Sequence, residues 1–409
     1  MRKIICFVLA FSVAVTYSVC FADEAEVSAP ATEYVSEGMY DNFETASVLS
    51  EAVQTDEIEI NATCGVLAEV STGKILYAKN ENETRSPASI TKIMTLLLCV
   101  EAIDSGRLAL TDKVTASEHA SSMGGSQIWL KPGETMTVDE MLKAVTVASA
   151  NDAAVALAEH IGGSEEGFVM MMNSRAKELS MDSTCFKNAC GLDVDGHFST
   201  AADIAKMSCE LLKHDLIKNY STIWMDYLRD GKTQLVNTNK LVRFYEGATG
   251  LKTGTTDKAG YCVAASAQKN GMELVAVILD GETSDKRFSS AKALLNYGFG
   301  AFELTKKTLD ETAFQTVMIN HGLESTADIT FDREKSFLLK KGKANNIEIK
   351  INMAESVNAP VSAGQLLGKV SFLLDGEIIG ESDVLAAKAV DKITFKTAFC
   401  RLLKEFFKT

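Results

Sequence analysis

Several common classes of protein are excluded by what this sequence lacks. No run of basic residues interrupts a chain of net charge −14, which argues against nucleic acid as a partner. No spacing of cysteine and histidine resembles a zinc site, so we expect neither a metal nor an organic cofactor. Seven of the nine cysteines lie beyond residue 22, and this odd number argues against a fully paired disulfide framework. Buried free thiols are the simplest interpretation, with a Cys185–Cys190 disulfide as the alternative.

The N-terminus predicts export. Arg2 and Lys3 precede an apolar stretch over residues 4–19, and Cys20-Phe21-Ala22 then precede two acidic residues. This order is typical of a secretory signal peptide at residues 1–22, cleaved after Ala22. Lipidation at Cys20 and a retained anchor helix are alternatives, although the stretch is too short to span a bilayer comfortably. We therefore expect a protein secreted across the cytoplasmic membrane.

Length and patterning predict more than one domain, since 409 residues favour two or three. Residues 23–55 are acidic and lack apolar periodicity, which indicates a flexible linker. A larger domain is expected at residues 56–304. Its expected strands lie at residues 62–69, 74–79, 261–268 and 273–279, with helices between them and a final helix at residues 285–297. Strands at both ends of the segment predict an α+β fold whose sheet joins distant parts of the chain.

Two smaller units are expected after residue 304. Residues 305–386 alternate in hydrophobicity between turn signals, which predicts a small all-β domain that acts as a spacer or a stabilising module. Residues 387–409 predict a basic amphipathic helix suited to an anionic membrane surface, on the outer face of the membrane. Packing of this helix against the β domain is the alternative. Its apolar face would carry Phe395, Phe399, Leu402, Leu403, Phe406 and Phe407.

Three short motifs indicate a serine acyl-transfer site: Ser89-Ile90-Thr91-Lys92, Ser149-Ala150-Asn151 and Lys252-Thr253-Gly254. A serine and a lysine three residues apart share one face of a helix, so the Lys92 amine can reach the Ser89 hydroxyl. A useful base needs a pKa below the ordinary lysine value of about 10.4, through burial and a nearby positive charge. Lys252 is the candidate for that charge.

The Ser-x-x-Lys spacing alone is not specific, because four other pairs share it: Ser71/Lys74, Ser174/Lys177, Ser266/Lys269 and Ser289/Lys292. Only Ser89 follows a proline, Pro87, at the start of an apolar-periodic helix. That helix would be buried and would leave Ser89 at the floor of a cleft. A helix N-cap is the alternative role for this serine.

With these motifs the chain resembles the low-molecular-mass penicillin-binding D-Ala-D-Ala carboxypeptidases of peptidase family S11. The resemblance runs from the signal peptide to the C-terminal helix, and residues 86–95, 123–127, 190–193 and 197–203 add to it. It implies a β-lactamase/transpeptidase-like catalytic domain of antiparallel sheet and helices at residues 56–304, followed by a small all-β sandwich.

The resemblance also implies catalytic roles. Ser89 would attack the carbonyl of the penultimate D-Ala, and Lys92 would accept the serine proton. Ser149 would relay a proton toward the leaving amine. Asn151 would hold the substrate amide and Lys92, and Lys252 would complete the electrostatic environment.

Substrate binding is implied for the end of the third motif and for one arginine. The backbone N–H groups of Ser89 and Thr255 would form an oxyanion hole. Arg287 would face the terminal carboxylate, with Thr253 and Thr255 as hydroxyl donors and Gly254 in the same segment. A solvated surface arginine is the alternative for Arg287.

The implied function is trimming of pentapeptide stems of peptidoglycan, with β-lactams as acylating inhibitors. Three alternatives stay open at this point. A β-lactamase would need a glutamate that activates the deacylating water, and neither Glu165 nor Glu166 can be assigned to that role. An endopeptidase would use the same site on crosslinks, and a non-catalytic scaffold would only bind wall peptides.

Overall fold

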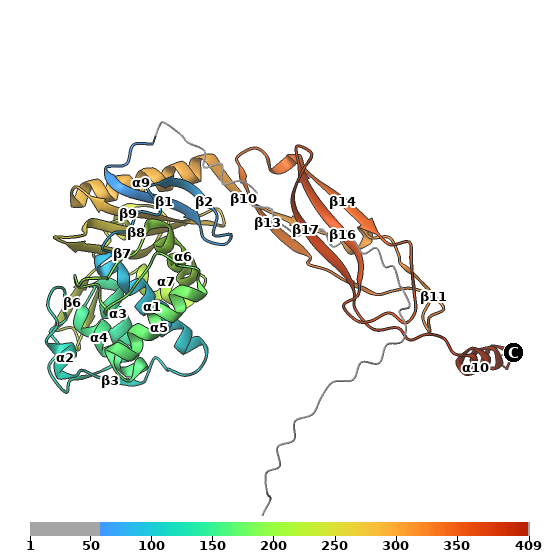
Figure 1. The fold of residues 1–409 in the computed structure, drawn as a ribbon, viewed down its shortest axis with the longest axis horizontal. Coiled ribbons are helices and arrows are strands. Elements are labelled where there is room, and N and C mark those ends of the chain that lie inside the picture. Colours follow the sequence, from blue (N-terminus) through green and yellow to red (C-terminus); the bar gives the residue numbers. More distant parts are fainter. Residues whose placement is uncertain (1–57, 408–409) are drawn as a thin grey trace, which may run out of the picture. The chain divides into compact units, whose positions relative to one another are not determined.

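The structure is a computed structural model that describes residues 58–407. The expected signal peptide and linker lie outside these residues. A five-stranded antiparallel sheet in the order β2-β1-β9-β8-β7 organises the first part of the described chain (Figure 1). Its strands are β1 (Ala62–Glu69), β2 (Ile75–Lys79), β7 (Ala248–Thr256), β8 (Gly260–Lys269) and β9 (Met272–Gly281). The sheet therefore joins segments about 200 residues apart, as expected from the sequence.

Both faces of this sheet are covered, which explains why its central strands are apolar almost throughout. Successive side chains of a strand point to opposite faces. Val66 packs into one cluster with the helices of the middle of the chain, and Leu67 packs into another with α9 (Ser284–Ala301). Figure 1 shows α9 along one face and α1, α3, α4, α5, α6 and α7 beyond the other.

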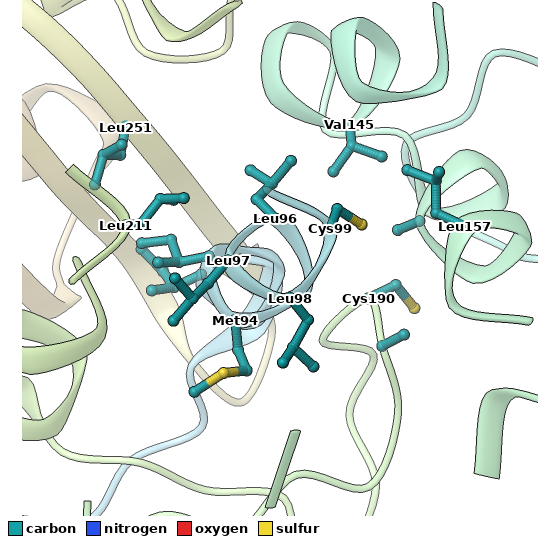
Figure 2. Close-up of a cluster of buried hydrophobic side chains, with 14 of the residues drawn as sticks. Met94, Leu96, Leu97, Leu98, Cys99, Val145, Leu157, Cys190, Leu211 and Leu251 are labelled. Carbon is teal, nitrogen blue, oxygen red and sulfur yellow. The ribbon is translucent and has the colours of Figure 1, made fainter. Parts of the chain in front are cut away.

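The segment between β2 and β7 forms the helical part. Helix α1 (Lys92–Asp104) is buried nearly all round, since every residue from 92 to 100 is buried. In Figure 2 this helix lies between Leu211 and Leu251 on one side and Val145 and Leu157 on the other. The other elements are η1 (Ala88–Thr91), β3 (Lys113–Thr115), α2 (Glu118–Ser121), β4 (Thr135–Thr137), α3 (Val138–Val147), α4 (Asn151–Gly162), α5 (Glu165–Glu178), α6 (Ala201–Leu212), α7 (Asp215–Ser221), β5 (Met225–Leu228), β6 (Thr233–Val236) and α8 (Leu241–Phe244).

The chain beyond α9 is built from strands and ends in one helix. A four-stranded antiparallel sheet has the order β12-β17-β16-β14, and two pairs of strands accompany it, β10-β13 and β11-β15. The bounds are β10 (Phe302–Thr308), β11 (Met318–Asn320), β12 (Ile329–Thr330), β13 (Glu334–Lys340), β14 (Ile347–Met353), β15 (Ser356–Asn358), β16 (Leu366–Leu374), β17 (Glu377–Ala386) and α10 (Phe395–Phe406), with 3₁₀ turns η2 (Glu311–Ala313) and η3 (Ala344–Asn346). The α+β fold followed by a β region and a terminal helix is confirmed.

Some local expectations need correction. The C-terminal helix begins at Phe395 rather than at residue 387. Val390 instead exchanges two backbone hydrogen bonds with Val361 and is buried in the β region. Cys185 and Cys190 carry free thiols, as do the other cysteines within residues 58–407. None of the helices in that range has the length and apolar content needed to cross a bilayer.

Candidate active site

Ser89 lies in a single 3₁₀ turn, η1, that leads directly into α1. Side chains three residues apart nearly eclipse one another in a 3₁₀ turn, and the Lys92 Nζ donates to Ser89 Oγ at 2.9 Å. The serine was expected in the first turn of the α-helix, so its place in the preceding tighter turn is a correction. It is not an N-cap, because Pro87 and Thr91 occupy the cap positions of the two segments.

Lys92 is fully buried and has three hydrogen-bond acceptors around its amine. Besides Ser89, its Nζ donates to Asn151 Oδ1 at 2.5 Å and to the Cys190 carbonyl at 2.7 Å. Burial lowers the pKa of Lys92 to about 8, partly opposed by Cys190 and Asp152. A substantial fraction of the amine is therefore neutral near pH 8, as a base for a serine hydroxyl requires.

The second motif occupies the joint between α3 and α4. Ser149 is buried there with a left-handed φ of 62°, an uncommon conformation for a residue other than glycine. Asn151 is the first residue of α4, so its side chain can reach Lys92. Its Nδ2 donates to the Gly124 carbonyl at 2.6 Å, and its backbone N–H donates to the Ser126 carbonyl at 2.7 Å. The loop at residues 123–127, singled out in the sequence, thus contacts the site through Asn151.

The third motif lies on β7, at one edge of the sheet, directly against Ser89. A side chain at Gly254 would put its Cβ 2.9 Å from the Pro87 carbonyl oxygen and 3.1 Å from the Ser89 nitrogen. Glycine is therefore required where the strand passes the nucleophile.

Lys252 and Thr253 precede that glycine on β7, and both are buried. Desolvation lowers the pKa of Lys252 well below its ordinary value, and the nearby charges of Lys92 and Arg287 lower it further. Its Nζ makes no hydrogen bond within residues 58–407. The Thr253 hydroxyl donates to Thr238 Oγ1 at 2.7 Å.

Arg287 is not a solvated surface residue. Its side chain, on α9, is only 7% exposed, and Nη1 donates to the Gly254 carbonyl at 3.0 Å and to Thr255 Oγ1 at 3.0 Å. Thr255 itself is exposed. Arg287 therefore fixes the end of the motif and adds a positive charge beside an accessible hydroxyl.

Three further groups at the site were given no role from the sequence, although Cys190 and His197 lie in segments that carry the resemblance. The Cys190 carbonyl accepts from Lys92, and a backbone carbonyl has no residue-type signature. Asp152 follows Asn151 and is fully buried. His197 Nδ1 accepts from the Lys187 N–H at 3.0 Å, so its Nε2 carries the proton and donates to Thr91 Oγ1 at 2.8 Å. Burial lowers the pKa of His197 to about 4, which keeps the ring neutral beside the Ser89 turn.

Two protein-family models match this chain. Residues 50–283 match the family model described as D-alanyl-D-alanine carboxypeptidase. This chain belongs to the D-alanyl-D-alanine carboxypeptidase family. Residues 302–392 match a second model, the C-terminal domain of penicillin-binding protein 5. The prediction of a serine carboxypeptidase of this family is confirmed.

Relatives of this carboxypeptidase family span most of the chain. D-alanyl-D-alanine carboxypeptidase DacF of Bacillus subtilis is 44% identical over 87% of this chain and 92% of its own length. DacC of Escherichia coli is 33% identical over 83% of this chain and 87% of its own length. Among solved structures, penicillin-binding protein 5 from Haemophilus influenzae superimposes with a TM-score of 0.72 and 30% identity, covering 82% of this chain and 98% of that chain.

Proposed function

We propose that this enzyme removes the terminal D-alanine from pentapeptide stems of peptidoglycan through an acyl-enzyme on Ser89. The observation that carries the proposal is the buried Lys92 amine, 2.9 Å from Ser89 Oγ and 2.5 Å from Asn151, beside the Gly254 edge of β7. This arrangement brings together a nucleophile, a base of lowered pKa and the edge of a strand.

Acylation begins when Ser89 Oγ attacks the carbonyl carbon of the penultimate D-Ala and its proton passes to Lys92. The bond from that carbonyl to the terminal D-Ala nitrogen breaks, and Ser149 relays a proton to the leaving amine, which departs as free D-alanine. Water then attacks the ester and gives a proton to Lys92. The bond to Ser89 Oγ breaks, Lys92 returns the proton to that oxygen, and a tetrapeptide stem leaves. The backbone N–H groups of Ser89 and Thr255 are the proposed donors to the oxyanion.

Recognition of the substrate is assigned to β7 and α9. Among the described strands β7 pairs only with β8, so its other edge can pair with the backbone of an extended peptide. Arg287 supplies positive charge for the free carboxylate that an exopeptidase must recognise, and a bound carboxylate would favour the charged form of Lys252. The hydroxyls of Thr253 and Thr255, which donate to Thr238 Oγ1 and to the Gly254 carbonyl in this structure, would turn toward the substrate. Asn151 remains the proposed partner of the substrate amide.

β-Lactams are proposed to acylate Ser89, because their carbonyl meets the same nucleophile and oxyanion donors. The β-lactamase alternative is weakened by Glu165, whose carboxylate accepts from the Ala189 N–H at 2.9 Å and pairs with His119 at 2.7 Å. A glutamate with these two partners has a structural role. No observation favours the scaffold or endopeptidase alternatives over the carboxypeptidase.

The location is also a proposal. Residues 1–22 would direct export, and α10 would hold the enzyme on the outer face of the cytoplasmic membrane. Phe395, Phe399 and Leu402 are 87%, 51% and 69% exposed, an unusual set of apolar side chains for one short helix. Lys396 and Lys404 on the same helix favour anionic lipid headgroups.

Release of D-alanine from diacetyl-Lys-D-Ala-D-Ala by residues 23–409 tests the function, with Ser89→Ala as control. Release by the parent and none by the variant is expected. If neither releases D-alanine while radiolabelled penicillin still acylates the parent at Ser89, the carboxypeptidase proposal fails and the endopeptidase or β-lactamase alternative replaces it. Retention of a wall phenotype by Ser89→Ala would support the scaffold.

A further inference from the structure

Trp129 combines two features that do not serve the core. Its side chain is 74% exposed, and its φ of 60° is left-handed, a strained conformation for a bulky residue. The backbone on both sides is nonetheless held in place. The N–H groups of Ile128 and Leu130 donate to the fully buried carboxylate of Asp152, at 3.2 Å and 3.0 Å. The fold thus holds the backbone in a strained conformation that places a large apolar side chain in solvent.

Trp129 lines an open groove of about 800 Å³. Arg229, in the turn between β5 and β6, joins the two sides of the groove. Its Nη1 donates to the Ile128 carbonyl at 2.8 Å, and its Nε pairs with Glu134 at 2.7 Å. Lys131, Lys232 and Gln234 provide further polar groups along the lining. The groove thus combines one exposed aromatic side chain with a largely polar lining.

The groove lies within reach of the active site. Trp129 follows Ser126 by three residues, so their Cα atoms are at most about 11 Å apart, and Ser126 accepts from Asn151. Four residues separate the sugar from the scissile bond in a pentapeptide stem, a span of at most about 14 Å. A stem acylated on Ser89 that runs along this loop would bring its sugar toward the groove.

We propose that this groove binds the glycan strand of peptidoglycan, with Trp129 as the surface on which a sugar ring stacks. The inference rests on the proposed function, because it concerns the same substrate. A pyranose ring presents a face of C–H groups to an indole, while its hydroxyl and acetamido groups need hydrogen-bond partners. Indole supplies that area with little loss of side-chain freedom. Lys131 and Lys232 donate, and Gln234 both donates and accepts.

The test compares two substrates on the chain of residues 23–409. One is diacetyl-Lys-D-Ala-D-Ala, and the other is an uncrosslinked glycan strand that carries pentapeptide stems. The measured quantity is the ratio of kcat/KM for the strand to kcat/KM for the short peptide. Trp129→Ala is expected to lower this ratio about tenfold, and Trp129→Phe, which keeps a ring, by less than about threefold. Phe244→Ala is the matched control, since Phe244 is 68% exposed and lies outside the groove lining, and it should leave the ratio unchanged.

A direct arm measures binding of a β-1,4-linked N-acetylglucosamine tetramer to the Ser89→Ala protein by titration calorimetry. Binding that is lost with Trp129→Ala supports the inference. A ratio that Trp129→Ala leaves unchanged would overturn the inference. If the ratio is unchanged because kcat/KM falls equally for both substrates, the groove holds peptide rather than glycan. If the parent cleaves neither substrate, the proposed function fails, and the tetramer titration alone then decides the groove.

Discussion

Two buried lysines set the chemistry at the scale of single residues. Lys92 has three hydrogen-bond acceptors, whereas the Lys252 amine has none within the described part of the chain. Both have a lowered pKa, mainly because burial disfavours the charged form. Lys92 is thus placed to take a proton, and Lys252 to act through its field or on a bound anion.

The pH dependence of acylation follows from Lys92. Only the neutral amine can accept the Ser89 proton, so the second-order rate constant for penicillin acylation should rise with pH and level off above about 8. Stopped-flow measurement between pH 6 and 10 checks this. A rate constant that is flat from pH 6 to 9 would exclude Lys92 as the base.

Lys252→Met should stabilise the fold while it impairs the enzyme. The buried Lys252 amine has no hydrogen bond, and such a group destabilises a fold by about 1–3 kcal/mol. The substitution removes this cost, so the thermal midpoint of unfolding should rise by several degrees. Penicillin acylation should fall roughly 100-fold, because the variant lacks an amine whose charged form the oxyanion and the bound carboxylate would favour. The exposed Lys258→Met serves as control and should change neither quantity. A lower midpoint for Lys252→Met would show that the amine stabilises the fold.

At the scale of elements, the Ser89 turn depends on the loop before α6. Gly191 has a φ of 87°, and a Cβ there would lie 1.9 Å from the Ala88 carbonyl oxygen. The same loop presents the Cys190 carbonyl to Lys92. The loop therefore fixes both the turn that carries the nucleophile and the amine that serves it.

Gly191→Ala should lower the free energy of unfolding by about 2–4 kcal/mol and should also slow acylation, because the turn must move. Gly73→Ala is the matched control. Gly73 also has a positive φ, of 67°, but nothing lies within 4 Å of its Cβ position, so only about 1 kcal/mol should be lost. Chemical denaturation and penicillin labelling of both variants measure these effects. Equal losses in the two would show that the contact with Ala88 is unimportant.

The sequence was most informative where local pattern and burial agree. Strand β1 was predicted at its observed bounds, and β8 and β9 to within two residues, because apolar runs there end at turn residues. The bounds of β10 and β13 were not predicted individually, because each strand is stabilised by the other across the intervening chain. The start of α10 was placed too early because the pairing of Val390 with Val361 leaves no periodic signal.

The candidate site divides in the same way. Ser89, Lys92 and Asn151 were predicted, and the structure brings their side chains together. The acceptor at Cys190 is a backbone carbonyl, and the Asp152 carboxylate accepts from the backbone N–H of Leu130 in a separate loop. Neither contact depends on a spacing of residue types, so the sequence did not indicate these two roles.

At the scale of the whole molecule, α10 carries the proposal that the enzyme works on a membrane surface. Residues 23–409 should sediment with vesicles that contain anionic lipid, and residues 23–394, which lack α10, should stay in solution. Phe399→Glu in the longer chain should weaken binding by about tenfold or more, because a charge replaces an apolar contact with the lipid. Binding of both chains to equal extents would contradict the proposed membrane surface. A shorter chain that ends at residue 386 is a poor control, because it removes the buried Val390.

Asn151 and Asp152 are consecutive residues at the start of α4, and each serves a different part of the molecule. The first contacts the base, and the second holds the backbone around Trp129. A substitution that removes the Asp152 anchor of the loop at Trp129 would therefore act directly beside the residue that contacts Lys92. The side chains of the loop at Trp129 can change without affecting this anchor. An inhibitor that extends along the loop would therefore contact a backbone that substitutions of those side chains do not easily displace.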